Sequence, residues 1–151
     1  MPLTLHALTP DSPDLDPVVA LLAAQMQEHD LPDAPERVRA GVLDAVRRPG
    51  VSRILVARRD DAAVGVALMH LLPSIEWGGR SLWIEELYVA PEHRRTGVAR
   101  ALLGEALRFA REQGAAGVDL ETTPGHAAAE QLYVQAGFIR RDRQRWALGI
   151  D

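Results

Sequence analysis

The first third of the chain has the pattern of a short strand followed by two helices. Residues 3–8 alternate weakly between apolar and polar side chains, which predicts a strand. From residue 11 to residue 29 apolar side chains recur every three or four positions, which predicts an amphipathic helix. A second, shorter helix is expected over residues 35–48, because Pro35 stands where a helix accepts proline, in its first turn.

The middle of the chain has the pattern of antiparallel strands. Residues 52–58 and 62–72 are rich in strand-forming side chains and flank a short polar turn, which is typical of a hairpin. A loop over residues 73–79 then leads into a third strand, residues 81–89. These three segments are expected to lie side by side in one sheet.

The last third of the chain alternates between helices and strands. After Thr96 we expect, in order, a long helix, a strand over residues 118–121, a helix that starts at Thr123 and Pro124 and ends near residue 135, and strands over residues 138–140 and 145–150. The full order predicts an α/β (α+β) fold, with a mixed, largely antiparallel sheet flanked by about four helices. We expect residues 1–151 to form a single domain.

Composition narrows the chemistry. The 151 residues include no cysteine, and all 17 basic residues are arginine, so a cysteine nucleophile, a disulfide framework and a lysine Schiff base are excluded. The net charge of −4 at pH 7 argues against nucleic-acid binding and favours a cationic partner. No apolar run of about 18 residues occurs, and residues 1–6 lack the pattern of a secretory signal, so we expect a cytoplasmic protein with no membrane segment.

The sharpest feature of the sequence is a strand, a loop and a helix start over residues 87–99. The strand is apolar, and the helix begins at Gly97, behind Arg94 and Arg95. The free backbone N–H groups and the dipole of a helix start attract an anion, and a glycine lets the backbone approach it closely. Arginine side chains, including Arg100, can add charge-assisted hydrogen bonds to phosphate oxygens. The spacing fits neither of the well-known phosphate loops, G-x-x-x-x-G-K-[ST] and G-x-G-x-x-G.

Two motifs carry a resemblance to a known family. Residues 94–99, R-R-T-G-V-A, resemble the R/Q-x-x-G-x-G/A motif of the GNAT superfamily of N-acetyltransferases. Residues 129–138, A-E-Q-L-Y-V-Q-A-G-F, are similar to the second motif of that family, A-x-x-L-Y-x-x-x-G-F. The order and separation of the two motifs match the family, as does the expected order of helices and strands.

The resemblance implies that acetyl-CoA is the co-substrate and lies between two splayed strands, residues 81–89 and 118–121. It implies pantetheine contacts on the backbone of Leu87, Tyr88 and Val89. It implies pyrophosphate contacts along the turn, at Arg94, Arg95, Thr96, Gly97, Val98, Ala99 and Arg100. Ala129 in the second motif is a further candidate for cofactor binding, and His126 stands where the family often has an asparagine that contacts pantetheine.

The resemblance also implies direct transfer of the acetyl group to an amine. An amine with a pKa near 10.4 is mostly protonated at pH 7 and must first lose a proton. That loss costs roughly 4 kcal/mol of free energy. By likeness to polyamine-type members Glu85 is the expected general base and Glu86 the alternative, since adjacent strand residues face opposite sides unless a bulge intervenes. Tyr133 is the expected general acid for the leaving thiolate, and the Val89 N–H the expected oxyanion donor.

The acceptor end is less defined. The resemblance places it against the first two helices and the loop before the third sheet strand, where the candidates are Gln25, Glu28, His29, Asp30, Asp33, Glu36, His70, Glu76 and Trp77. Their acidic excess suits a primary amine on a small molecule or peptide, such as a polyamine, an aminoglycoside, a lysine side chain or a peptide N-terminus.

Other interpretations stay open. One is a catalytically inert acyl-CoA sensor with the same fold, and another is a toxin-type acetyltransferase of aminoacyl-tRNA. A homodimer is common in the family, so the chain is a candidate for one. We expect no metal site, because the five histidines lack ligand spacing.

Overall fold

The computed structural model describes residues 2–150, which divide into two compact units, one ending at Glu121 and the other beginning at Thr122. The first unit contains, in chain order, β1 (Thr4–Ala7), α1 (Leu15–Glu28), α2 (Pro35–Val46), β2 (Ser52–Arg59), β3 (Ala62–Ser74), β4 (Gly79–Val89), a 3₁₀ turn (Pro91–His93), α3 (Val98–Glu112) and β5 (Gly117–Leu120). The second unit contains α4 (Ala127–Gln135), and residues 136–150 that follow form no helix or strand.

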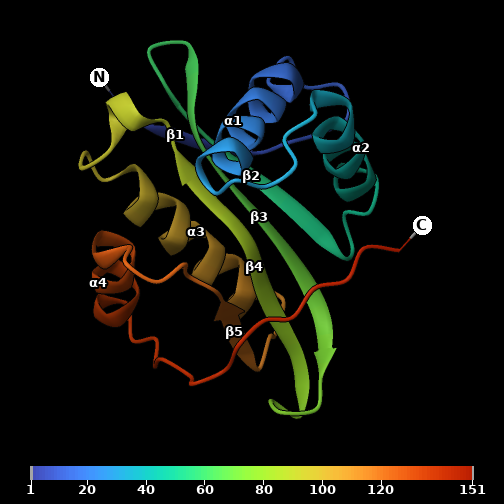
Figure 1. The fold of residues 1–151 in the computed structure, drawn as a ribbon, viewed down its shortest axis with the longest axis vertical. Coiled ribbons are helices and arrows are strands. Elements are labelled where there is room, and N and C mark those ends of the chain that lie inside the picture. The colour runs from blue at the N-terminus through green and yellow to red at the C-terminus, as the bar shows by residue number, and fades with distance from the viewer. Residues whose placement is uncertain (1, 151) are drawn as a thin grey trace. The chain divides into compact units, whose positions relative to one another are not determined.

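The strands form one sheet in the order β1-β2-β3-β4-β5 (Figure 1). Neighbouring strands are antiparallel except β4 and β5, which are parallel and are connected through α3. The turn between β2 and β3 is tight because Asp60 and Asp61 both adopt positive φ, 53° and 63°, a conformation that short polar side chains tolerate. The predicted fold class is therefore confirmed.

Helices cover both faces of the sheet. On one face α1 and α2 lie side by side (Figure 1) and bury a cluster that includes Ile54 on β2 and Leu68 on β3. On the other face α3 packs closely against β3. A Cβ at Gly65 would lie 2.9 Å from Val98 Cγ1 and 3.1 Å from Leu102 Cδ1, so a glycine permits this approach. Because side chains alternate along a strand, residues in phase with Leu68 face α1 and α2, and residues in phase with Gly65 face α3.

The prediction of two final strands was wrong. Residues 138–150 pair with no strand of the described chain. Trp146, Leu148 and Ile150 show the alternation that suggested a strand, yet their side chains are 85–89% exposed. A strand forms only where its backbone groups find a partner, and a period of two in the sequence supplies none.

Two predicted boundaries also differ from the structure. The last helix begins at Ala127 rather than at Pro124, because Gly125 adopts a φ of +93°, which a right-handed helix cannot contain. The expected loop over residues 73–79 shrinks to residues 75–78, because β3 extends to Ser74 and β4 starts at Gly79. The single-domain organisation of residues 1–151 stays a prediction.

Candidate functional site

The pairing between β4 and β5 ends partway along β4. It runs from Ser81 opposite Gly117 to Ile84 opposite Leu120, where β5 ends. β4 continues to Val89 with β3 on its other side. Within the first unit, the β4 edge from residue 85 to residue 89 therefore carries backbone groups that no described strand of that unit pairs with. The family resemblance of the sequence predicts that pantetheine binds along this edge.

Leu87 and Val89 direct their backbone groups toward this open edge. The Ala90 N–H donates to the Val64 carbonyl at 2.9 Å, toward β3. Successive residues of a strand direct their backbone groups to alternate sides, so those of Tyr88 also face β3 while those of Leu87 and Val89 face away from it. The Val89 N–H is thus placed to donate to a ligand at the open edge.

Glu85 lies at a β-bulge. Leu68 pairs with Glu86 and Met69 pairs with Ile84, which leaves Glu85 as an extra residue in β4. Its Oε1 lies 2.6 Å from His70 Nε2 on β3, and it is 42% exposed. The bulge therefore keeps this carboxylate accessible while the neighbouring strand holds it.

The bulge also places Glu85 and Glu86 on the same face of the sheet. Glu86 lies opposite Leu68, and opposite residues of an antiparallel pair share a face. Glu85 reaches His70, which is two residues from Leu68 on β3 and so shares its face. The bulge is the exception that the sequence analysis allowed for, because the extra residue resets the alternation. Both carboxylates face the side that α1 and α2 cover.

The turn between β4 and α3 has a backbone suited to an anion. Arg95 and Gly97 adopt positive φ, 62° and 89°, and Gly97 is the N-cap of α3. The N–H groups of Val98 and Ala99 at the start of α3 have no acceptor within the helix. Together with the helix dipole they favour a negative group at this end of α3.

Side chains hold this turn in place. Thr96 Oγ1 donates to the His93 carbonyl at 2.5 Å and accepts from Arg59 Nη1 at 3.0 Å. Val98 is buried against β3. Arg95 and Arg100 have exposed side chains on either side of Gly97. The turn thus presents its backbone and two arginines outward while its hydroxyl and valine bind it to the sheet.

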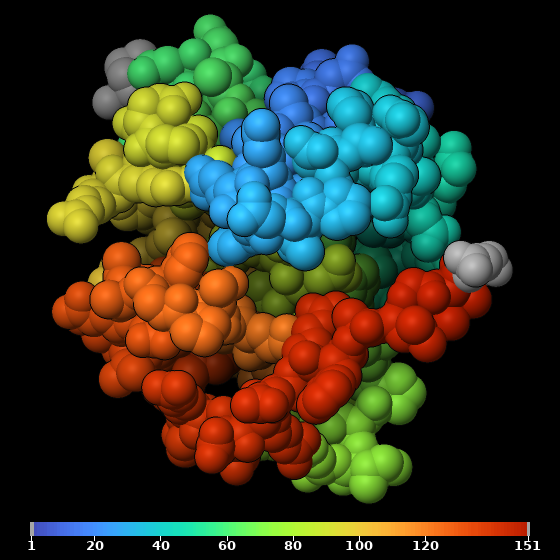
Figure 2. All heavy atoms as spheres, in the orientation of Figure 1, coloured from blue at the N-terminus to red at the C-terminus, as the bar shows by residue number. Residues whose placement is uncertain are grey.

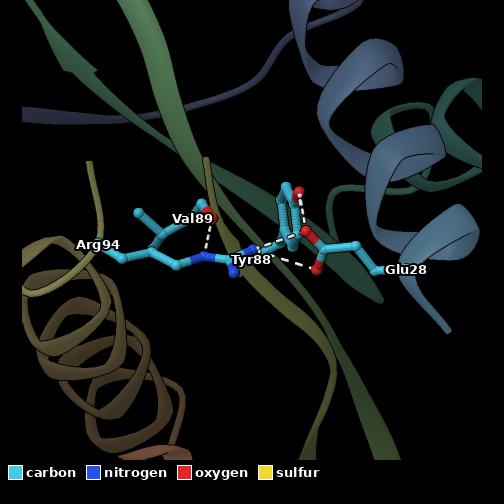
Figure 3. Close-up of polar contacts among 4 residues, drawn as sticks. All are labelled: Glu28, Tyr88, Val89 and Arg94. Atoms are coloured by element: carbon cyan, nitrogen blue, oxygen red, sulfur yellow. Dashed lines mark hydrogen bonds and ion pairs between the residues drawn. The ribbon is translucent and has the colours of Figure 1, made fainter. Parts of the chain in front are cut away.

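Arg94 joins the end of β4 to the end of α1 (Figure 3). Its Nε donates to the Val89 carbonyl at 2.9 Å, and its Nη2 donates to both carboxylate oxygens of Glu28 at 3.0 and 3.1 Å. The Tyr88 hydroxyl donates to Glu28 Oε1 at 3.1 Å. Figure 2 shows the segment after β4, in yellow, against the end of α1, in light blue. The guanidinium is thus engaged with protein groups, and its contact with phosphate stays a prediction.

The pKa values of both tyrosines lie above the ordinary value of a phenol. Burial, helped by the hydrogen bond and the charge of Glu28, raises the pKa of Tyr88 against the opposing charge of Arg94. Burial raises the pKa of Tyr133. The Tyr133 ring meets Phe138 edge-on, with centroids 5.8 Å apart. A raised pKa keeps a phenol protonated at neutral pH, as a proton donor requires.

We expect the phenolate absorbance of the folded protein near 295 nm to rise at a higher pH than that of free tyrosine, because the chain has two tyrosines and the pKa of each is raised. Since both phenols hold their protons more tightly in the folded chain, their contribution to stability is present below pH 10 and is lost as the pH rises through their folded-state pKa values. A spectrophotometric titration of the parent, of Tyr88→Phe and of Tyr133→Phe checks this. A phenol that titrates like free tyrosine contradicts it.

The remaining cofactor candidates lie in the second unit. His126 is the exposed N-cap residue of α4, and Ala129 lies in the first turn of that helix. Ala129 and Tyr133 are four residues apart and so lie on one face of α4. The contacts of His126, Ala129 and Tyr133 with a ligand stay predictions.

The acceptor-side candidates do not all lie together. Near the end of α1, Glu28 is bound to Arg94, and Gln25 is buried with its Oε1 lacking a hydrogen-bond partner among the described residues. Trp77 lies at the opposite end of β4 from Val89, where its indole N–H donates to Asp119 Oδ2 at 3.0 Å and its ring covers Gly117. We therefore leave Trp77 out of the site.

Ser52 is a site residue that no sequence motif indicated. This buried side chain lies on β2 opposite His70, with Ser52 Oγ 2.7 Å from His70 Nδ1. His70 was expected only as an acceptor-side residue. A signal was available, because Ser52 and His70 are in phase with the core residues Ile54 and Leu68 and so share their face. The register that sets them opposite one another is visible only in the folded sheet.

The positive φ of Gly97 predicts that a larger residue there weakens acetyl-CoA binding. A valine there must adopt a φ of +89°, which costs roughly 1–3 kcal/mol and distorts the turn. We expect Gly97→Val to weaken acetyl-CoA binding about tenfold or more while the protein stays folded. Gly114→Val is the matched control, because Gly114 also has a positive φ and an open Cβ position but lies beyond the other end of α3. Calorimetric binding and thermal melting of both variants decide it, and unchanged affinity in a folded Gly97→Val protein contradicts it.

The described residues contain neither a cluster suited to a metal ion nor a membrane-spanning helix. Among residues 2–150 no group of three or more histidine, aspartate or glutamate side chains could hold a metal ion. Over the same residues, no helix has the length and apolar character needed to cross a bilayer. The first unit instead combines an open strand edge, a helix N-terminus behind a glycine, and an accessible carboxylate on a bulge.

Comparison with known proteins identifies the class that this arrangement belongs to. Residues 16–138, which are most of the chain, match the Acetyltransferase (GNAT) family. The chain therefore belongs to the GNAT acetyltransferase family.

Curated relatives resemble part of the chain. It is 42% identical to N-acetyltransferase 8 of Homo sapiens over 83 residues, which cover 55% of this chain and 37% of that protein. It is 45% identical to streptothricin acetyltransferase of Streptomyces lavendulae over 62 residues, which cover 41% of this chain and 32% of that protein. The match thus spans about a third of the length of these relatives.

Solved structures resemble the whole chain. A Trypanosoma brucei acetyltransferase is 25% identical with a TM-score of 0.75, over 97% of this chain and 100% of that chain. AAC(6')-Iy, in complex with the bisubstrate analogue CoA-S-monomethyl-acetylneamine, is 17% identical with a TM-score of 0.81 over 100% of both chains, a likeness that concerns the fold alone.

Proposed function

We propose that this chain transfers the acetyl group of acetyl-CoA directly to a primary amine of a small molecule or peptide. The observation that carries the proposal is the open β4 edge, which leads into the helix N-terminus at Gly97. The backbone of Leu87 and Val89 suits an amide-containing chain such as pantetheine, and the turn suits its pyrophosphate. The family membership and the complex of AAC(6')-Iy with a CoA-containing analogue support acyl-CoA as the co-substrate.

Glu85 acts as the general base in this proposal. It accepts a proton from the acceptor ammonium, and the freed nitrogen lone pair attacks the thioester carbonyl. The Val89 N–H donates to the oxyanion that forms there, because it points to the open edge. The carbon–sulfur bond then breaks, and the thiolate takes a proton from the Tyr133 hydroxyl. The nitrogen, which begins as an ammonium, loses two protons as it gains the acetyl group: the first goes to Glu85, and the second restores the Tyr133 hydroxyl. CoA leaves as the thiol.

A cationic acceptor fits the acidic and polar residues near the end of α1. The buried Gln25 Oε1 can accept a hydrogen bond from an ammonium group, as a buried carbonyl without a partner calls for. Glu85 and Glu86 add two carboxylates on the same face. One relative is named for streptothricin and AAC(6')-Iy for aminoglycosides, whose amino groups support this class of acceptor. The cytoplasmic location and a homodimer stay predictions.

The test is thiol release from acetyl-CoA against spermidine, an aminoglycoside, a lysine peptide and a free peptide N-terminus. The chain has no cysteine, so the protein adds no thiol of its own to the signal. Amine-dependent release with one class supports the proposal and names the acceptor class. Binding of acetyl-CoA without turnover on any amine would favour an inert acyl-CoA sensor instead, and turnover on aminoacyl-tRNA would favour the toxin-type activity.

A further inference from the structure

A chain of hydrogen bonds crosses three neighbouring strands beneath Glu85. Ser52 on β2 contacts His70 on β3 at 2.7 Å, and His70 contacts Glu85 on β4 at 2.6 Å. Exposure rises along the chain, because Ser52 is buried, His70 is 20% exposed and Glu85 is 42% exposed. The accessible carboxylate is therefore connected to the interior through one imidazole ring.

The chemistry of the three groups fixes where the protons lie. An ionised carboxylate only accepts hydrogen bonds, so His70 Nε2 must carry a hydrogen to bond to Glu85. In a neutral imidazole the other nitrogen, Nδ1, then accepts, and Ser52 can donate its hydroxyl hydrogen to it. Glu85 thus favours the Nε2–H tautomer, and Ser52 stabilises it by donating to Nδ1.

The backbone holds Ser52 and His70 rigidly but leaves Glu85 without a register partner. Ser52 and His70 are directly opposite in the β2–β3 ladder, the Ser52 N–H donates to the Arg48 carbonyl at 2.8 Å, and the Leu71 N–H donates to the Val51 carbonyl at 2.7 Å. Glu85 is the extra residue of the bulge. Its carboxylate is therefore oriented by a side-chain contact.

We propose that His70 is a positioning residue that orients the Glu85 carboxylate toward the acceptor amine, and that Ser52 stabilises the tautomer in which His70 does so. The inference rests on the proposed function, in which Glu85 is the general base. His70 acts through Glu85, and its hydrogen bond to the carboxylate replaces rotational freedom by a single orientation.

The tautomer is measured without any acceptor, by long-range ¹⁵N–¹H NMR of the histidine rings. His70→Gln assigns the His70 signals among the five histidines. We expect the neutral Nε2–H tautomer in the parent and a mixed population in Ser52→Ala. A His70 ring with its hydrogen on Nδ1 in the parent would overturn the inference, because Nε2 would then have no hydrogen to give the carboxylate.

Kinetics with acetyl-CoA and the most active amine of the panel test the positioning. We expect His70→Ala to lower kcat about 10- to 100-fold, the size of a hydrogen bond to a charged group, with the acetyl-CoA KM unchanged. His70→Gln keeps an N–H donor near the position of Nε2 and should restore most of the rate. His6→Gln is the matched control, because His6 also contacts a carboxylate, Asp14 at 3.0 Å, but lies on β1 away from β4.

The double variant separates this inference from the proposed function. If His70 acts through Glu85, adding His70→Ala to Glu85→Gln should lower kcat no further. A parental rate in Glu85→Gln would overturn the base assignment and this inference with it. An inactive Glu85→Gln beside a fully active His70→Ala would overturn the positioning role alone, and so would equal losses in His70→Gln and His70→Ala.

Discussion

Replacing Glu85 by glutamine is expected to lower kcat by about 10²–10⁴-fold, the usual contribution of a general base. The amide has the shape of the carboxylate and can still accept the hydrogen bond from His70 Nε2, so the local structure should persist. It cannot accept the proton of the acceptor ammonium, which then remains a poor nucleophile. Steady-state thiol release at saturating acetyl-CoA measures the loss.

Glu86→Gln is the matched control for this change. Both residues lie on β4 and face the same side of the sheet, but Glu86 lies in the regular ladder opposite Leu68. We expect a small effect on kcat in Glu86→Gln and an unchanged melting temperature in both variants. If Glu86→Gln is the inactive variant, Glu86 is the general base. Glu85, at the bulge, then orients the acceptor.

Replacing Tyr133 by phenylalanine is expected to lower kcat by about 10²-fold, at the lower end for loss of a general acid. Burial raises the pKa of Tyr133, so the phenol is fully protonated at neutral pH and can deliver its proton to the thiolate. The phenylalanine ring keeps the edge-on contact with Phe138. Acetyl-CoA affinity, measured by calorimetry, should therefore stay at the parental value.

Tyr88→Phe serves as the control, since the chain has one other tyrosine. Its hydroxyl contacts Glu28, and its loss should leave the leaving-group step unaffected. A rate that depends more strongly on the acidity of the leaving thiol in Tyr133→Phe than in the parent would add support. Equal turnover in Tyr133→Phe and the parent would remove the acid assignment.

Local patterns predicted the helices and the meander of strands well. The helix over residues 35–48 and the strands over residues 52–58 and 81–89 all occur, because proline placement and period-two alternation are properties of neighbouring residues. The turn at residues 94–99 could be predicted for the same reason, since a glycine between a strand and a helix has a local conformational meaning.

The parts that the sequence did not predict depend on contacts between distant residues. The ion pair of Arg94 with Glu28 joins residues 66 positions apart, and the bulge at Glu85 is defined only by its register against β3. A one-residue shift of register changes which face each side chain takes. The relation of Glu85 to Glu86 could therefore not be settled from their adjacency.

In the final segment, residues 138–150, the sequence pattern predicted strands that the structure does not contain. Trp146, Leu148 and Ile150 have a clear strand pattern, and the structure describes no ladder for them. Alternation reports how side chains would divide between two faces, and it does not report whether a neighbouring strand is present to accept the backbone.

The open edge of β4 also bears on how long the protein survives. A strand edge with unpaired amides is a template on which a foreign strand can add, which is the first step of many aggregation reactions. A ligand that binds the same amides blocks that addition and also stabilises the native state, by an amount that grows with the logarithm of its concentration. If acetyl-CoA is that ligand, its concentration would set the resistance of the protein to aggregation as well as its rate.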